Sequence, residues 1–286
     1  MSEEIGAIVQ AIEGLNPESN PFKDYVFPVI TAFLSSLLGA FVAYFTIRHQ
    51  DNVLSVKEKI GAMNDCSLSV ENAMTSLVAI KNNYKDGLSN NPIQRALFIK
   101  SLVNDISRIE VNISTLSFIV PSKNDVSGQG EKWRSLPRIR SLVGNYNSLI
   151  DLWDKRKELE RPIKERLVKA YGSNGYAEMN VSQILSGVDS SDFVMLIDLT
   201  ERAVKYTDEL LIESGDFLDK FPKIGEKLIS RNNRKKYGPL LAFTSKENKK
   251  LQEVFIKTVE VDYLIVADLF GISEEDARKQ YESGYE

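Results

Sequence analysis

Apolar side chains recur with helical spacing along most of this chain, and one stretch is apolar on all sides. No residue from Tyr25 to Ile47 is charged. A helix of this length is about 34 Å long at ~1.5 Å per residue, enough to cross a hydrocarbon core of roughly 30 Å. Tyr25 and Tyr44 stand near its two ends, as in the aromatic belts of membrane helices. We therefore predict a transmembrane helix over residues 25–47, in preference to a buried core helix or a cleaved signal peptide.

The charges that flank this stretch predict its orientation. Residues 1–24 hold one basic residue and five acidic ones, whereas Arg48, Lys57 and Lys59 follow the stretch. By the positive-inside rule, the N-terminal segment is expected outside the cytoplasm and residues 48–286 inside it. The expected location is the inner (cytoplasmic) membrane of a bacterium, crossed once, although the sequence does not identify the class of organism.

Small residues form a stripe along the predicted membrane helix. They recur every four residues, at Thr31, Ser35, Gly39 and Ala43. This spacing lets two membrane helices approach closely, so we expect self-association in the bilayer and a homo-oligomer. No ionisable residue lies within 25–47, which disfavours a proton relay or an ion pump.

The rest of the chain predicts an all-α fold, a long-helix bundle with coiled-coil-like packing. A largely apolar heptad over residues 53–84 predicts one long helix, and a second apolar seam over 99–120 predicts another. Asn91 precedes a proline and is the expected N-cap of the second helix. These two helices are expected to form an antiparallel hairpin over residues 48–120.

Residues 121–137 are the clearest loop, with two glycines, two prolines and few apolar side chains. Further helices are predicted over residues 138–286. The expected domains are therefore 1–24 outside the membrane, 25–47 within it, and 48–286 as the cytosolic bundle.

Prolines and capping residues divide the last part of the chain. We expect Pro162 to interrupt or kink the third helix of the bundle. Asp189 or Ser190 is expected to cap a fourth helix, which Pro222 would end. A fifth helix is expected over residues 246–270, which carry apolar side chains at helical spacing.

The chain holds one cysteine and one histidine, which limits its chemistry. These counts exclude an internal disulfide framework and multi-thiolate or His-pair metal sites, and they disfavour a His-based triad. Neither a Walker A motif nor G-x-G-x-x-G occurs. Cys66 is interpreted as a packing residue. We predict no catalytic residue, no metal site and no cofactor, and therefore a protein that is not an enzyme.

Basic residues concentrate in residues 223–257, where ten stand against three acidic ones, and residues 258–286 then hold eight acidic and two basic residues. The candidates for binding an anionic lipid, a nucleic acid or a phosphorylated ligand are Arg231, Arg234, Lys235, Lys236, Lys249 and Lys250. Residues 229–239 are expected in a loop. The alternative is a solvated surface, or one paired with the acidic segment. Because residues 48–286 carry equal numbers of basic and acidic residues, nucleic acid is the disfavoured partner.

These features predict a membrane-anchored helical interaction or scaffold protein. It would self-associate and recruit a protein partner, of unknown identity, at the cytoplasmic face of the lipid bilayer. The alternative is a membrane-perturbing effector of a bacterial defence or toxin system, gated by its cytosolic helical domain. The plan resembles that of many bacterial membrane proteins with one N-terminal span, and no motif identifies a family.

Overall fold

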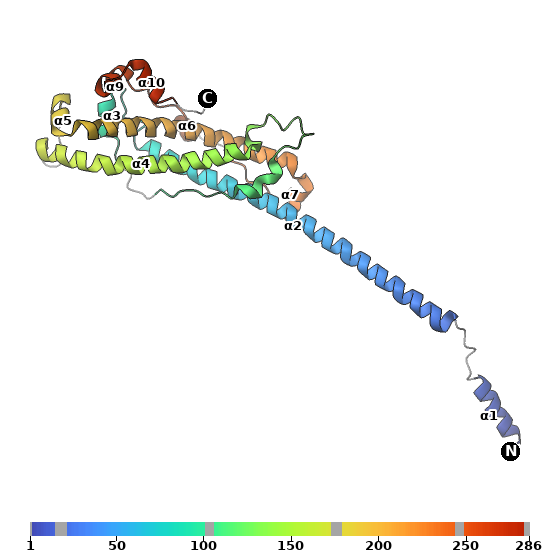
Figure 1. Ribbon diagram of the computed structural model, residues 1–286. Coiled ribbons are helices and arrows are strands. Elements are labelled where there is room, and N and C mark those ends of the chain that lie inside the picture. Colours follow the sequence, from blue (N-terminus) through green and yellow to red (C-terminus); the bar gives the residue numbers. More distant parts are fainter. Residues whose placement is uncertain (1, 15–21, 101–105, 173–178, 244–248, 283–286) are drawn as a thin grey trace. The chain divides into compact units, whose positions relative to one another are not determined.

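The computed structural model describes residues 2–14, 22–100, 106–172, 179–243 and 249–282 (Figure 1). Over these residues the fold is all-helical without strands, which confirms the predicted fold class. The helices are α1 (Ser2–Gly14), the π-helical turn η1 (Phe22–Val26), α2 (Phe27–Asn82), α3 (Pro92–Phe98), the 3-10 helices η2 (Ile113–Ile119) and η3 (Lys132–Arg134), α4 (Leu136–Tyr171), α5 (Val181–Gly187), α6 (Ser190–Leu228), α7 (Arg231–Tyr237), α8 (Lys249–Val254), α9 (Tyr263–Phe270) and α10 (Glu274–Gln280).

The chain divides into two compact units, Met1–Ser55 and Val56–Glu286. The first unit holds α1, η1 and the apolar beginning of α2. In the second unit α4 and α6 lie side by side and antiparallel, and the short helix α5 lies at the end where α4 ends and α6 begins (Figure 1). The part of α2 from Val56 onward contributes to the same core as α4 and α6.

Apolar and aromatic side chains from these three helices fill the main core of the second unit. Tyr84, just after α2, stacks on Trp153 of α4 with ring centroids 6.0 Å apart. Both rings are buried. Cys66 also lies in this core, as expected for a packing residue, and burial raises the pKa of its thiol to about 12. A protonated, enclosed thiol has little nucleophilic character at neutral pH.

Asp189 caps α6 as predicted, accepting hydrogen bonds from the amides of Ser191 and Asp192.

Two prolines lie inside long helices. Helix α6 continues through Pro222 to Leu228, so the prediction that this proline ends the helix is wrong. Phe221 and Ile224 are buried on either side of it, and this packing holds the helix despite the missing amide. Helix α4 likewise runs through Pro162.

The second helix of the predicted hairpin does not form as expected. Asn91 does cap a helix, but α3 ends at Phe98, residues 106–112 are irregular and the 3-10 helix η2 follows. The amide group of Asn147 on α4 binds both the N–H and the C=O of Ile109, at 3.0 and 2.9 Å. These bonds replace the intrahelical ones that a β-branched segment would form weakly.

The predicted helix over residues 246–270 is also divided. Helix α8 ends at Val254 and α9 begins at Tyr263, and the residues between them, which we call the 255–262 segment, are not helical. Four of the six residues from Ile256 to Val261 are β-branched, which favours extended backbone. Its amide and carbonyl groups are bound by buried side chains, described below.

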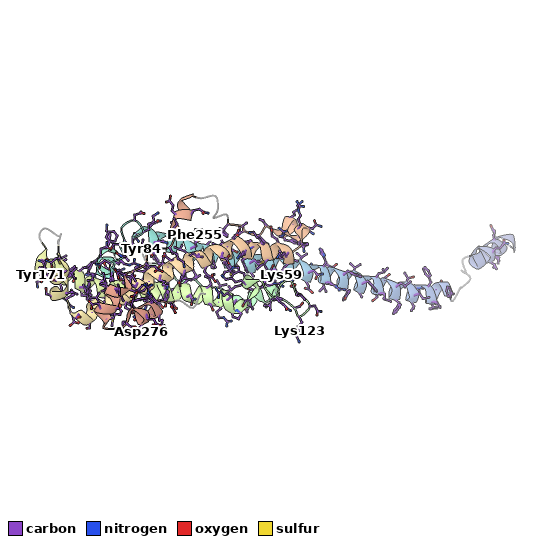
Figure 2. All side chains as sticks on the ribbon, turned by 90° about the horizontal axis from the view of Figure 1, so that it is seen from above. Lys59, Tyr84, Lys123, Tyr171, Phe255 and Asp276 are labelled. Atoms are coloured by element: carbon purple, nitrogen blue, oxygen red, sulfur yellow. The ribbon has the colours of Figure 1, made fainter. Side chains whose placement is uncertain are left out.

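Residues 121–131 form turns, in agreement with the predicted loop, although α4 begins one residue before the predicted end of that loop. Trp133 anchors the loop to the bundle. Its indole N–H donates to Asp216 at 2.9 Å, and its ring lies edge-on to Phe217 with centroids 4.9 Å apart. Figure 2 shows Lys123 of this loop at the same end of the second unit as Lys59, and Tyr171 at the other end.

Candidate functional site

The apolar beginning of α2 has no partner within the described part of the chain. By length and composition this helix can cross a membrane, and none of its most apolar window, with a mean hydropathy of 2.1, is buried. Phe33, Leu38 and Phe41 are each more than half exposed. An exposed apolar surface of this extent marks a membrane or protein contact.

The predicted stripe of small residues lies on this exposed helix. Thr31, Ser35, Gly39 and Ala43 are all exposed. The hydroxyl of Thr31 donates to the carbonyl of Phe27 at 2.7 Å, so the helix itself satisfies this donor. A side chain added at Gly39 would meet nothing within 4 Å in the chain. The stripe is therefore open to a second helix, and its role in self-association stays a prediction.

The candidate basic residues are distributed differently from the prediction. Residues 231–237 form helix α7, and the expected loop is wrong, because Ser230 caps the helix by accepting from the amide of Asn233 at 3.3 Å. Arg234 is half-buried and pairs with Glu226 at 3.1 Å. Arg231, Lys235 and Lys236 are exposed on the same helix.

The other two candidates are separate from α7 in the chain. Lys249 and Lys250 begin α8, and their side chains lie outside the described residues. In the acidic segment that follows, Glu274 and Glu275 pair with Arg278 and Lys279 of their own helix. Figure 1 shows α10 and α7 toward opposite ends of the second unit, and no ion pair joins them among the described residues.

Buried charges hold the 255–262 segment in place. Lys81 at the end of α2 pairs with Asp208 of α6 at 2.7 Å, and both side chains are under a tenth exposed. The ammonium group of Lys81 also donates to the carbonyl of Ile256 at 2.5 Å. The carboxylate of Asp208 accepts from the amide of Thr258 at 2.6 Å. One ion pair thus binds two backbone groups of this segment.

A second buried ion pair lies next to the first. The guanidinium of Arg95 on α3 pairs with Glu201 of α6 at 2.8 Å and donates to the carbonyl of Val259 at 2.7 Å. A cavity of about 330 Å³ lies beside both pairs and is lined by α6, the 255–262 segment and the start of α9. Tyr281 also lines it.

A third buried cluster surrounds Arg156 of α4. Its guanidinium donates to Glu160 at 2.7 Å, to the hydroxyl of Thr200 at 2.9 Å and to the carbonyl of Ala96 at 2.9 Å. Arg156 therefore joins α4, α6 and the end of α3. Buried arginines of this kind are retained when each donor has an acceptor.

Burial gives one of these carboxyl groups an unusual pKa. Desolvation raises the pKa of Glu201 to about 7, against the opposing charges of Arg95 and Arg156. This carboxyl group therefore takes up a proton near neutrality in the folded chain, whereas an ordinary glutamate does so near pH 4.5.

We expect Glu201 to make the bundle less stable as the pH rises from about 4.5 to about 7. In this window the folded chain holds a proton that the unfolded chain has released, so unfolding becomes easier at higher pH and the effect is complete above pH 7. In Glu201→Gln this contribution is absent. Urea unfolding at several pH values should show the stability of the variant rising relative to the native chain across this window, and a constant difference would contradict the expectation.

Sequence reasoning missed these buried charges, although the spacing contained a signal. Lys81 occupies an apolar seam position of the first bundle helix. Glu201 and Asp208 are seven residues apart and share the apolar face of α6 with Val204 and Leu211. A charged residue at a core position points to a buried partner elsewhere in the chain.

Comparison of the chain with protein-family models, with curated proteins and with solved structures gave no match. Among the described residues, no three His, Cys, Asp or Glu side chains are arranged to hold a metal ion.

Proposed function

We propose that this protein is a single-pass, membrane-anchored helical scaffold. The apolar part of α2 would lie in the bilayer, and the second unit would recruit a protein partner at the cytoplasmic face. The observation that carries the proposal is the apolar window of α2, of which none is buried within the chain. In water this surface would be costly to expose, and a bilayer removes that cost.

The flanking charges support an orientation with the N-terminus outside and the second unit in the cytoplasm, and the membrane we propose is the inner membrane of a bacterium. The single basic residue before the apolar stretch stands among five acidic ones, while Arg48 and Lys57 follow it. The rigid second unit suits a scaffold, because buried ion pairs fix α2, α3 and α6 relative to the 255–262 segment. Fixed elements present a constant surface to a partner.

Fractionation of cells that express the full chain tests this proposal. We expect the protein to stay in the membrane fraction after alkaline carbonate extraction, with an intact mass that excludes cleavage of the N-terminal segment. Leu37→Arg with Leu38→Arg should release it, because each charge costs about 3 kcal/mol near the centre of a span. Growth arrest and loss of membrane potential on expression would instead support the membrane-perturbing effector.

We expect Gly39→Leu to weaken self-association by about tenfold, since a larger side chain separates two helices packed along the stripe. Energy transfer between labelled chains in vesicles measures the dimer fraction as the protein is diluted in lipid. Phe41→Leu changes the opposite side of the helix and is the matched control. Equal dimer fractions in both variants would show that the stripe does not drive self-association.

A further inference from the structure

Exposed basic side chains gather around helix α7. Arg231, Lys235 and Lys236 are exposed on this helix, and Lys57 is exposed on α2. The ammonium groups of Lys57 and Lys236 lie 5.9 and 5.1 Å from the ring centroid of Tyr237, so α7 and α2 bring their charges together. We call these four basic residues and Tyr237 the basic end of the second unit.

The residues that follow helix α7 are hydrogen-bonded to α2. The side-chain amide of Asn64 donates to the carbonyl of Pro239 at 3.1 Å and accepts from the amide of Leu241 at 3.0 Å. Arg234 donates to the carbonyl of Ile229 at 3.1 Å, in addition to its pair with Glu226. Arg234 therefore positions the helix, and the basic end is a preorganised surface.

Within the described residues, no ion pair involves Lys57, Arg231, Lys235 or Lys236. Glu226 is paired with Arg234. Glu58 is exposed next to Lys57 in the chain, but consecutive residues of a helix point about 100° apart. The excess positive charge of the basic end is thus available to an external anion.

The chain length keeps the basic end within reach of the proposed membrane. Ten residues lead from Ile47, the last residue of the apolar stretch, to Lys57. These two residues cannot lie more than about 36 Å apart, whatever the arrangement of the two units. A surface so close in the chain to a membrane anchor meets lipid headgroups at high effective concentration.

We propose that the basic end binds anionic phospholipid headgroups on the face of the bilayer from which the second unit emerges. The lysines and Arg231 would contact the phosphates, and Tyr237 has the amphipathic ring that favours the headgroup layer. This inference rests on the proposed function, since it needs the anchor in the bilayer. It adds a second, charge-dependent contact that orients the bundle against the membrane.

The test uses the full chain in nanodiscs, with an environment-sensitive fluorophore on Asn232→Cys. Asn232 is exposed on α7, and the native Cys66 is buried and stays unlabelled. We expect a blue shift in discs that contain phosphatidylglycerol, a smaller one at high salt, and none in pure phosphatidylcholine. A label on Ser182→Cys of α5, at the opposite end of the unit, is the control and should not shift (Figure 1).

The matched variant replaces Lys57, Lys235 and Lys236 by glutamine. Each charge contributes about fivefold, so the ratio of docked to undocked protein should fall roughly 100-fold. Equal shifts in both lipids, no shift in either, or a shift produced only by added RNA would each overturn the inference. Failure of the chain to enter nanodiscs or resist carbonate extraction would refute the anchor itself, which separates the two proposals.

Discussion

Replacing Asp208 by alanine is expected to lower the free energy of unfolding of the bundle by about 3–5 kcal/mol. The substitution leaves the buried ammonium of Lys81 without its carboxylate and removes the acceptor of the Thr258 amide. An uncompensated buried charge is among the largest single losses that a fold sustains. Denaturant unfolding of the full chain in a mild detergent, followed by helical circular dichroism, measures the difference.

Two variants control this experiment. Glu165→Ala removes an exposed i,i+4 pair with Arg161 and should cost about 0.5 kcal/mol or less. Changing Lys81 and Asp208 together to methionine and leucine should cost less than Asp208→Ala alone, because no charge is left unpaired. If Asp208→Ala costs no more than Glu165→Ala, the buried pair does not hold the 255–262 segment.

The second large effect is expected at Arg156. Arg156→Ala removes the donors that reach Glu160, Thr200 and the carbonyl of Ala96. These buried acceptors then lose their hydrogen bonds from the guanidinium group. We expect a loss of about 3–5 kcal/mol, which corresponds to a decrease in Tm of roughly 6–20 °C for a unit of this size. Thermal unfolding measured by circular dichroism tests this value.

Arg156→Lys sharpens this prediction. A lysine keeps the charge but lacks the planar, five-donor fork, so it should recover only part of the lost stability. Arg161→Ala, which removes an exposed arginine five residues along the same helix, should change Tm little. Full recovery by lysine would show that charge alone, and not the set of hydrogen bonds, stabilises this junction.

Features with a local cause could be predicted from the sequence. The caps at Asn91 and Asp189 form because their side chains accept hydrogen bonds from amides two or three residues ahead. The apolar stretch in α2 is evident from its length and lack of charge. The long helix of residues 53–84 was predicted because its heptad spacing places the side chains on one face.

Features whose cause is a residue far away in the sequence could not be predicted. Nothing local to Ile109 indicates that Asn147 binds its backbone, and nothing local to Ile256 indicates the ammonium of Lys81. Helical spacing alone therefore predicts continuous helices over residues 99–120 and 246–270, whereas the backbone at Ile109 and Ile256 is not helical. Pro222 was misjudged for a similar reason, because the packing of Phe221 that keeps α6 helical is tertiary.

The sequence predicts which residues near α7 are basic, but not which distant residues lie beside them in the structure. The sequence indicated a basic cluster at Arg231, Lys235 and Lys236, and the structure adds Lys57 and assigns Arg234 to a structural pair. Lys57 lies far from α7 in the sequence, so no local pattern could join them. The buried pairs that hold the 255–262 segment were missed for the same physical reason.

Labelling of single cysteines in intact cells tests whether α2 anchors the protein in the membrane. Ser19→Cys precedes the proposed span in the sequence, and Lys123→Cys lies in the second unit beyond it. The buried Cys66 should not react. We expect an impermeant maleimide to label residue 19 in intact cells, but residue 123 only after the membrane is opened. Labelling of both residues in intact cells, or of neither, would contradict the proposed orientation. Recovery of the full chain in the soluble fraction would contradict the anchor.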